Sequence, residues 1–281
     1  MKPFALPRWR KKHIREKYQR KDMLIHRFSI EMESVMRKAV NRIVDFGIRT
    51  GRFTKPSLNE MYLVTERFYR SLLEQAFTSA HHEKLEQRGK KRLGKLPIGL
   101  PRRLKDLRQV FNDETYWRRI MKRSHVLTKR LKNEYIQKLE AQFKVLIPKL
   151  NSGEYTSAEV KEQMMTVWGA SKSRVETIFR TETTKYFVQT QIKFFSDDEN
   201  IIGFLFDSVR DTSRTEICRS RHGLVYRPGS KELTENSPPC HFNCRSHLIA
   251  LANNEFNRKL IEDRDRDPSK VRVVPLPSDW Q

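Results

Sequence analysis

The sequence predicts an α+β protein, with mainly long helices in the N-terminal two-thirds and a small β-containing Cys/His module at the C-terminal end. Three observations predict this arrangement. Apolar residues recur at helical spacing over long stretches before residue 196. Short apolar runs typical of strands follow after it. All three cysteines and three of the eight histidines fall between Ile201 and Leu251.

Composition divides the chain into four expected segments. The first, residues 1–21, carries nine Lys or Arg against the single acid Glu16, which is typical of a mobile basic arm. A helical region follows at residues 22–155, then the Cys/His module at residues 156–251 and a tail at residues 252–281. The tail is expected to become ordered by lying on a neighbouring protein.

The helical region opens with a periodic stretch near Asp22, and we expect its first helix to end at Gly47 and Gly51. Ser57 and Glu60 form a capping box, which predicts the start of a second helix. An aromatic stripe along this helix could serve as a platform for nucleobases, but we favour core packing between two antiparallel helices. The stripe consists of Tyr62, Phe68, Tyr69 and Phe77.

A basic loop is expected at residues 84–105, where glycines and prolines interrupt the helical pattern and nine Lys or Arg face one acid. The loop contains no aromatic residue, so contact with phosphate is favoured over stacking on bases. The arm and this loop supply the candidate DNA contacts: Arg8, Arg10, Lys11, Lys12, Lys90, Lys91, Arg92, Lys95, Arg102 and Arg103.

Helical periodicity returns over residues 113–147, and Pro148 is expected to end that helix together with Gly153. A second capping box, Thr156-x-x-Glu159, then predicts a short helix. Gly169 is expected to separate this short helix from a final helix that runs from Ser171 to Phe195.

Extended structure is expected after residue 200. Three runs have strand character and are joined by a turn and a polar segment. The runs lie at residues 201–206, 223–226 and 247–251. The polar segment 231–237 is expected to be mobile.

The cysteines and histidines form the pattern Cys218-x3-His222, then Cys240-His241-x2-Cys244. Thiolates and imidazoles are the ligands of structural zinc, so this pattern allows a zinc site. Its possible ligands are Cys218, His222, His241 and Cys244. A compact turn without metal is an alternative, and a disulfide between Cys218 and one of the other two cysteines is a third.

A group of residues around this pattern resembles the Mu F-like family of tailed-phage head proteins, also called SPP1-type head morphogenesis proteins. The resemblance covers about Val160 to Leu251 and includes the helical segment Arg180-Thr181-Glu182-Thr183. Arg180 and Glu182 could form a catalytic pair, but two residues apart on a helix they point in different directions, so a structural role is favoured. The other residues that carry the resemblance are Asp211, Arg214, Cys218, His222, Gly223, Pro239, His241, Asn243, Cys244 and Arg245.

The resemblance implies a minor head protein without enzymatic activity, which acts during procapsid assembly inside the shell and near the portal. The implied partners are phage portal and capsid proteins and packaged double-stranded DNA, contacted without sequence specificity. The implied location is the virion, after assembly in the host cytoplasm. A net charge of +23 agrees independently with a polyanionic partner.

Other classes find less support in the sequence. No apolar run of about 18 residues is present, so a membrane helix is not expected, and the N-terminus lacks the apolar stretch of a secretory signal. Phosphate-binding, hydrolase and zinc-protease motifs are absent. The enzyme alternative is a metal-dependent nuclease of the His-Asn-His or treble-clef type, although the sequence shows no second acidic ligand near its histidines. It would use Asp211, His222, His241, Asn243 and His247.

Overall fold

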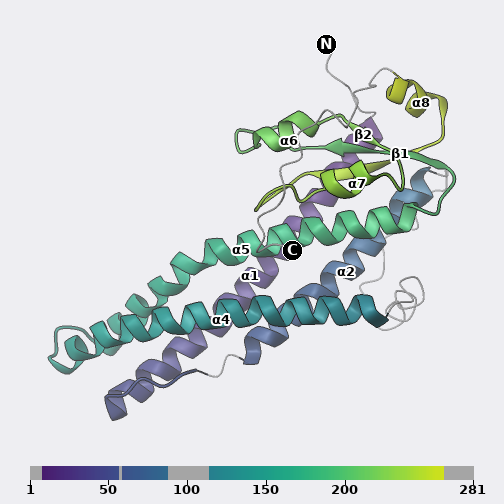
Figure 1. Cartoon of the computed structure of the whole chain (residues 1–281). Coiled ribbons are helices and arrows are strands. Elements are labelled where there is room, and N and C mark those ends of the chain that lie inside the picture. The colour runs from purple at the N-terminus through teal and green to yellow at the C-terminus, as the bar shows by residue number, and fades with distance from the viewer. Residues whose placement is uncertain (1–7, 57–58, 88–113, 263–281) are drawn as a thin grey trace. The chain divides into compact units, whose positions relative to one another are not determined.

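The computed structural model describes residues 8–56, 59–87 and 114–262 (Figure 1). Four long helices dominate the described chain. They are α1 Arg8–Thr50, α2 Asn59–Gln87, α4 Glu114–Asn151 and α5 Ser157–Phe195. The remaining elements follow α5 and are short: β1 Ile201–Asp207, α6 Glu216–Arg221, β2 Val225–Tyr226, α7 Lys231–Asn236, β3 His247–Ala252 and α8 Glu255–Glu262.

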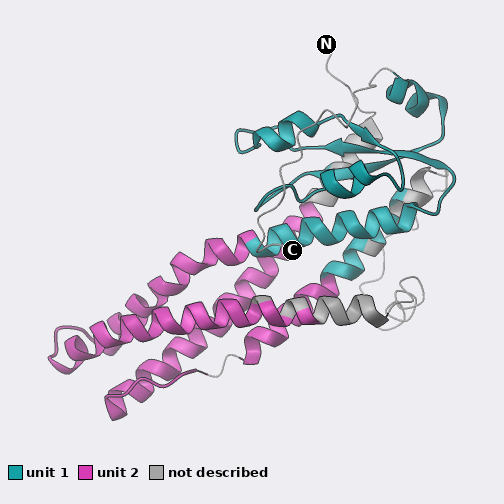
Figure 2. Ribbon diagram, viewed as in Figure 1, with its two compact units in different colours: residues 1–18, 72–107, 178–281 teal, residues 19–71, 108–177 magenta. Residues whose placement is uncertain are grey.

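The chain forms two compact units, each assembled from distant parts of the sequence (Figure 2). Unit 1 combines residues 1–18, 72–107 and 178–281, and unit 2 combines residues 19–71 and 108–177. The expected segments instead follow one another along the chain. The units differ in content, because all three strands belong to unit 1 whereas the described part of unit 2 is helical.

Unit 2 is held together by apolar and aromatic side chains between its helices. Phe28 of α1 packs edge-on against Phe68 of α2 with ring centroids 5.4 Å apart, and Tyr135 of α4 packs similarly against Trp168 of α5. All four of these side chains are buried. Phe68 and its neighbour Tyr69 therefore belong to the core, as expected, and are not available for base stacking.

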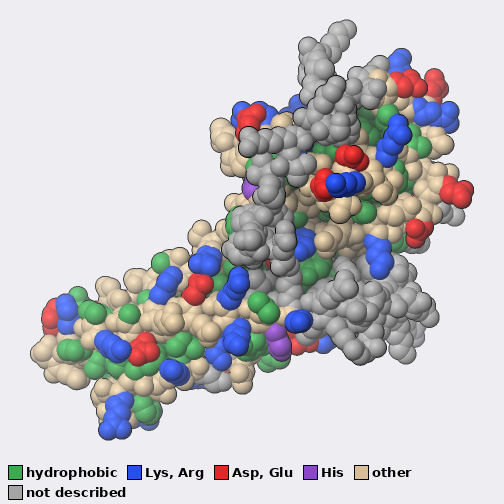
Figure 3. All heavy atoms as spheres, viewed as in Figure 1, with side chains coloured by type: hydrophobic (Ala, Val, Ile, Leu, Met, Phe, Trp, Pro, Cys, Tyr) green, Lys and Arg blue, Asp and Glu red, His purple; other side chains and the backbone are tan. Residues whose placement is uncertain are grey.

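The surface of unit 2 carries ion pairs that join its helices. Arg37 of α1 contacts Glu162 of α5, and Arg174 of α5 contacts Glu134 of α4. Because these side chains are largely exposed, each pair adds little stability. The face seen in Figure 3 shows Lys and Arg side chains spread among acidic ones along the helices, without a single dense basic patch.

The structure corrects three expected helix interruptions, although α1 does end at Thr50, directly before Gly51, as expected. Gly47 lies inside α1, where a Cβ atom would come 2.4 Å from the Phe143 ring of α4, so glycine permits a close approach of the two helices. Gly169 lies inside an uninterrupted α5, and Pro148 lies inside α4. A glycine costs a helix only about 1 kcal/mol, which the buried residues on either side readily offset. Gly153, with φ of 80°, follows the end of α4 as expected.

Two further expectations change. Helix α1 begins at Arg8, so residues 8–21 are helical where an arm was expected. The segment 231–237, expected to be mobile, contains α7, whose first turn is capped by the Ser230 side chain accepting from the Leu233 backbone N–H. The capping box at Thr156 is confirmed, because its hydroxyl accepts from Glu159 N–H and the Glu159 carboxylate accepts from Thr156 N–H.

The sheet of unit 1 has the strand order β2-β1-β3, with both pairs antiparallel. The expected strands are confirmed, and Phe204 of β1 lies opposite both Tyr226 of β2 and Ala250 of β3. One face of the sheet packs in a cluster with Phe195 from the end of α5 and with Leu224. The three cysteines belong to the same buried cluster. Among the described helices, none combines the length and apolar character needed to cross a membrane.

Candidate functional site

The Cys/His site of unit 1 brings together α6 and the turn formed by residues 240–244. The Cys218 Sγ atom lies 3.2 Å from Nε2 of His241 and 3.8 Å from Sγ of Cys244. The candidate ligand atoms of these three residues lie within 4.8 Å of one another. All three cysteines are free thiols and buried, so the expected disulfide alternative is not formed in this structure.

Cys240 is the chain neighbour of His241 and is buried in the same cluster as Cys218 and Cys244. The Cys240 thiol also donates to the Asn236 carbonyl oxygen at 3.8 Å. Three of the four expected ligands, Cys218, His241 and Cys244, therefore lie together, with Cys240 buried nearby. Cys240 and His241 are consecutive in the sequence, so the turn that places His241 in the site also places Cys240 close to it.

The side chains of this group shift one another's pKa values. Side-chain hydrogen bonding with Cys218 and Cys240 lowers the pKa of Cys244 well below its ordinary value, whereas hydrogen bonding with Cys218 and Cys244 raises the pKa of Cys240. Hydrogen bonds with Cys218 and Cys244 raise the pKa of His241 to about 10. The lowered pKa of the Cys244 thiol favours its thiolate form, and the raised pKa of His241 favours a protonated imidazole beside it.

Helix α5 holds the turn in place through two threonines. The Thr184 hydroxyl donates to the Cys244 carbonyl oxygen at 2.7 Å, and the Asn243 N–H donates to the Thr181 hydroxyl at 2.9 Å. Both threonines are fully buried. Asn243 adopts a positive φ of 60°, a conformation that asparagine tolerates better than most residues, and this reverses the chain before Cys244.

The sequence did not predict the roles of Thr181 and Thr184, because only the charged residues Arg180 and Glu182 stood out in this part of the helix. Glu182 is buried and Arg180 is half-buried in α5, and their expected structural role stays a prediction. The available signal was the run of hydroxyl residues itself, because buried threonines on a helix seek partners for their hydroxyl groups.

Other residues of the resemblance support the loops around the site. Asp211 pairs with Arg245 at 2.6 Å. Gly223 has a positive φ of 86° and its N–H donates to the Phe206 carbonyl oxygen, which ties the loop after α6 to β1. Arg214 donates to the Ser208 hydroxyl at 3.4 Å, and Pro239 follows a cis peptide bond.

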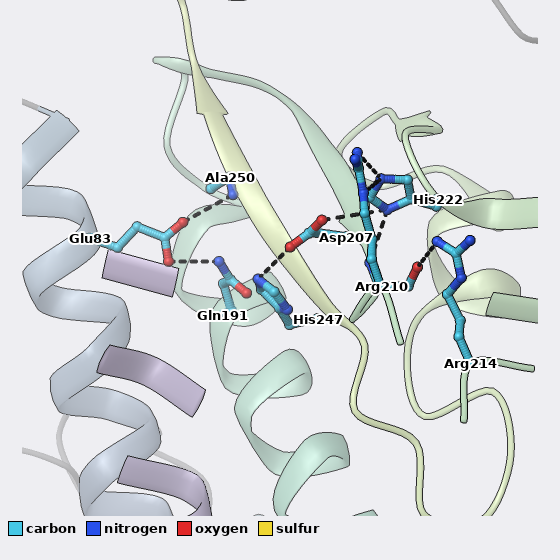
Figure 4. Close-up of polar contacts among 9 residues, drawn as sticks. Glu83, Gln191, Asp207, Arg210, Arg214, His222, His247 and Ala250 are labelled. Carbon is cyan, nitrogen blue, oxygen red and sulfur yellow. Dashed lines mark hydrogen bonds and ion pairs between the residues drawn. The ribbon is translucent and has the colours of Figure 1, made fainter. Parts of the chain in front are cut away.

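The structure places His222 away from the sulfur group, contrary to the expected ligand set. Its Nδ1 lies 3.1 Å from the Ser208 backbone nitrogen, and its Nε2 lies 2.9 Å from a guanidinium nitrogen of Arg210 (Figure 4). The physical reason is the end of α6: His222 is the C-cap residue with extended backbone, whereas Cys218 lies one turn earlier on the helix. The two side chains therefore point to different sites.

A second polar site forms around Asp207 at the end of β1 (Figure 4). Its carboxylate lies 3.5 Å from Nδ1 of His222 and 3.4 Å from Nε2 of His247. Burial raises the pKa of Asp207 to about 6, and the nearby charge of Arg210 opposes this effect. Asp207 is the acidic neighbour of the histidines that the sequence analysis did not find.

The five residues of the nuclease alternative do not form one site. His222 and His247 flank Asp207, His241 lies among the cysteines, and Asp211 is paired with Arg245. Among the described residues, the group able to hold a metal ion is the one that contains Cys218, His241 and Cys244.

The candidate DNA contacts lie where the structure describes no side chains. Arg8, Arg10, Lys11 and Lys12 fall within the first turns of α1, and their side chains are outside the described set. The loop candidates Lys90, Lys91, Arg92, Lys95, Arg102 and Arg103 fall between the described ranges.

Comparison with known proteins agrees with the resemblance. Residues 118–249 match the family described as phage Mu protein F like protein, a match that begins in α4 and ends in β3. Searches of curated proteins and of solved structures found no match. The matched region contains the Cys/His turn and the helix that holds it. Over this region, just under half of its length, the chain is therefore similar to the phage Mu protein F like family.

Proposed function

We propose that this chain is a minor head protein of a tailed phage that acts in head morphogenesis near the portal, inside the shell, and contacts packaged DNA. The observation that carries the proposal is the family match over residues 118–249, a family of phage head proteins. The described side chains fit an architectural role, since long helices offer extended surfaces for protein partners and the Cys/His turn is fixed by buried contacts.

The DNA contact is supported by charge. The net charge of +23 is concentrated in part in the basic loop, which has nine Lys or Arg among residues 84–105. Positive charge of this kind binds phosphate without reading bases, which suits a protein that meets a whole genome. Packaged double-stranded DNA is therefore the proposed polyanion, and portal and capsid proteins are the proposed protein partners.

The competing proposal is a metal-dependent nuclease. Its specific support is the carboxylate of Asp207 beside two histidines. Against it, His222 is engaged by Arg210 and by the Ser208 N–H, and the half-buried Asp207 carboxylate already lies 3.4–3.5 Å from both histidines. These contacts engage the groups that would have to bind a metal ion. We therefore propose a non-enzymatic role.

Purified particles of the phage that encodes this chain test the architectural role. Mass spectrometry should find the chain in mature virions, and crosslinking should join it to portal or shell proteins. Deleting the gene should reduce the number of filled heads. Finding the chain in infected cells but never in particles would contradict the proposal. Nicking of plasmid DNA by the pure protein with magnesium, manganese or zinc, abolished by Asp207→Ala, would establish the nuclease instead.

The DNA contact has its own test. Replacing Lys90, Lys91 and Arg92 by alanine should reduce the slope of log affinity against log salt by about 3, because each lost phosphate contact releases about 0.9 fewer counterions. A matched variant with the same change in charge is Arg227→Ala, Lys231→Ala and Lys259→Ala, three exposed residues of unit 1. Equal slopes for the two triple variants would show that the basic loop does not bind DNA.

A further inference from the structure

The site formed by the three cysteines and His241 has the composition of a closed zinc centre. Cys218 comes from α6, and the other three come from the turn that follows α7. The site thus joins two segments that are 22 residues apart at their closest, between Cys218 and Cys240. Neither α6 nor α7, each six residues long, could hold this arrangement by its own helical stability.

The distances between the donor atoms match a tetrahedral site. Zinc bonds sulfur at about 2.3 Å, so two sulfur ligands of a tetrahedron are separated by about 3.8 Å. The Sγ atoms of Cys218 and Cys244 are 3.8 Å apart. A sulfur–nitrogen edge is slightly shorter than a sulfur–sulfur edge because zinc bonds nitrogen at about 2.0 Å, and Cys218 Sγ lies 3.2 Å from His241 Nε2.

The imidazole of His241 is oriented for metal binding by its other nitrogen. Nδ1 lies 2.7 Å from the Phe242 carbonyl oxygen, which can only accept, so Nδ1 carries the proton. Nε2, the atom facing the sulfurs, is then the nitrogen that gives up its proton and offers a lone pair when a metal ion binds. A backbone carbonyl that fixes the tautomer in this way is the usual outer partner of a zinc-bound histidine.

Cys240 is the candidate fourth ligand. It is buried in the same cluster as Cys218 and Cys244 and adjoins His241 in the chain, and its thiol makes a hydrogen bond to the Asn236 carbonyl oxygen in this structure. A disulfide would use two of the three cysteines and leave the third buried beside them, whereas a three-sulfur, one-nitrogen site uses every donor. The 3.8 Å separation of the Cys218 and Cys244 sulfurs is also well beyond the bond length of about 2.05 Å in a disulfide.

We propose that Cys218, Cys240, His241 and Cys244 bind one zinc ion with a structural role. Four protein ligands leave no position for water or substrate, so the ion fixes the 240–244 turn against α6 and takes no part in catalysis. Because Thr181 and Thr184 attach the same turn to α5, the ion would connect α6 to α5 through it. This proposal goes beyond the proposed function and does not depend on it.

The test uses the full chain, purified under reducing conditions without added metal. Elemental analysis should find about one zinc per chain, and titration of the chelator-treated protein with Co²⁺ should give the visible absorption of tetrahedral cobalt. Cys240→Ser should lower the affinity for zinc by at least about 100-fold, beyond the 10–100-fold cost typical of outer-shell changes. His222→Ala, which removes a nearby histidine that lies outside the site, should retain one zinc and the cobalt spectrum.

Three results would overturn the proposal. One is a folded wild-type chain that binds neither zinc nor cobalt. Another is a Cys240→Ser variant with the affinity and cobalt spectrum of the wild type, which would exclude Cys240 as a ligand. The third is a Cys218–Cys244 disulfide in the protein as purified. If Cys240→Ser does not fold, the sulfur-to-cobalt charge-transfer intensity of the wild type decides: three thiolates support the proposal and two contradict it.

Discussion

Glu83 of α2 offers a sharp test of how unit 1 is stabilised, because a buried carboxylate joins a helix to the edge of the sheet. Its two oxygens accept hydrogen bonds from the Ala250 N–H of β3 at 3.1 Å and from the Gln191 side-chain amide of α5 at 2.8 Å (Figure 4). Since β3 is an edge strand, Glu83 occupies a position where another strand would otherwise pair.

Glu83→Ala should destabilise the protein strongly. The change removes the acceptor of two buried donors, and each such loss costs about 1–3 kcal/mol. The sum, about 2–6 kcal/mol, includes the range of about 3–5 kcal/mol for removing one partner of a buried charged contact. Glu83→Gln keeps one acceptor oxygen but turns an NH₂ group toward the other donor, so about half of that loss is expected.

The assay is urea unfolding of the full chain, combined with hydrogen exchange at the Ala250 amide as a local measurement. Glu199→Ala is the matched control, because it removes an exposed acid from the same unit and should change stability by less than about 0.5 kcal/mol. If Glu83→Ala unfolds at the same urea concentration as Glu199→Ala and Ala250 exchanges at the wild-type rate, the reasoning is refuted.

Three further predictions concern single residues. Gly169→Ala should raise the free energy of unfolding by about 0.5–1 kcal/mol, because a Cβ atom there meets nothing within 4 Å inside α5; a lower melting temperature would contradict this. Thr184→Val should cost about 1–3 kcal/mol, since the Cys244 carbonyl oxygen loses its 2.7 Å donor, whereas Thr184→Ser should cost less; chemical unfolding compares the two. Burial raises the pKa of Asp207 from 3.8 to about 6, so the folded state binds this proton more tightly than the unfolded chain does. The contribution of Asp207 to the free energy of unfolding is therefore fully present below about pH 4 and is lost as the pH rises through about 6, a loss of about 3 kcal/mol. Asp207→Asn should remove this loss from the pH profile of stability, while the neighbouring His222, His247 and Arg210 remain. An unchanged profile would refute it.

Local patterns in the sequence were sufficient to predict the secondary structure of most of the chain. Apolar periodicity predicted the long helices, and short β-rich runs predicted all three strands, because both signals depend on neighbours a few residues apart. Pro148 lies inside α4 although proline costs a helix interior about 3 kcal/mol, and the breaks at Gly47 and Gly169 were wrong for the complementary reason. A glycine weakens a helix only locally, whereas packing such as that of Phe143 on Gly47 acts between helices.

The sequence by itself determined that cysteines and histidines gather after β1 and that the chain carries a large positive charge. Only the tertiary structure decided which of those residues share a site. His222 and Cys218 are four residues apart yet face different partners, whereas Cys218 and Cys244 are 26 residues apart and touch. Thr184 and Glu83 make buried hydrogen bonds to partners that lie 60 and 167 residues away. Spacing along the sequence fixes the distance between two residues only when both lie in the same helix or strand. Distances between residues of different elements depend on how the backbone folds.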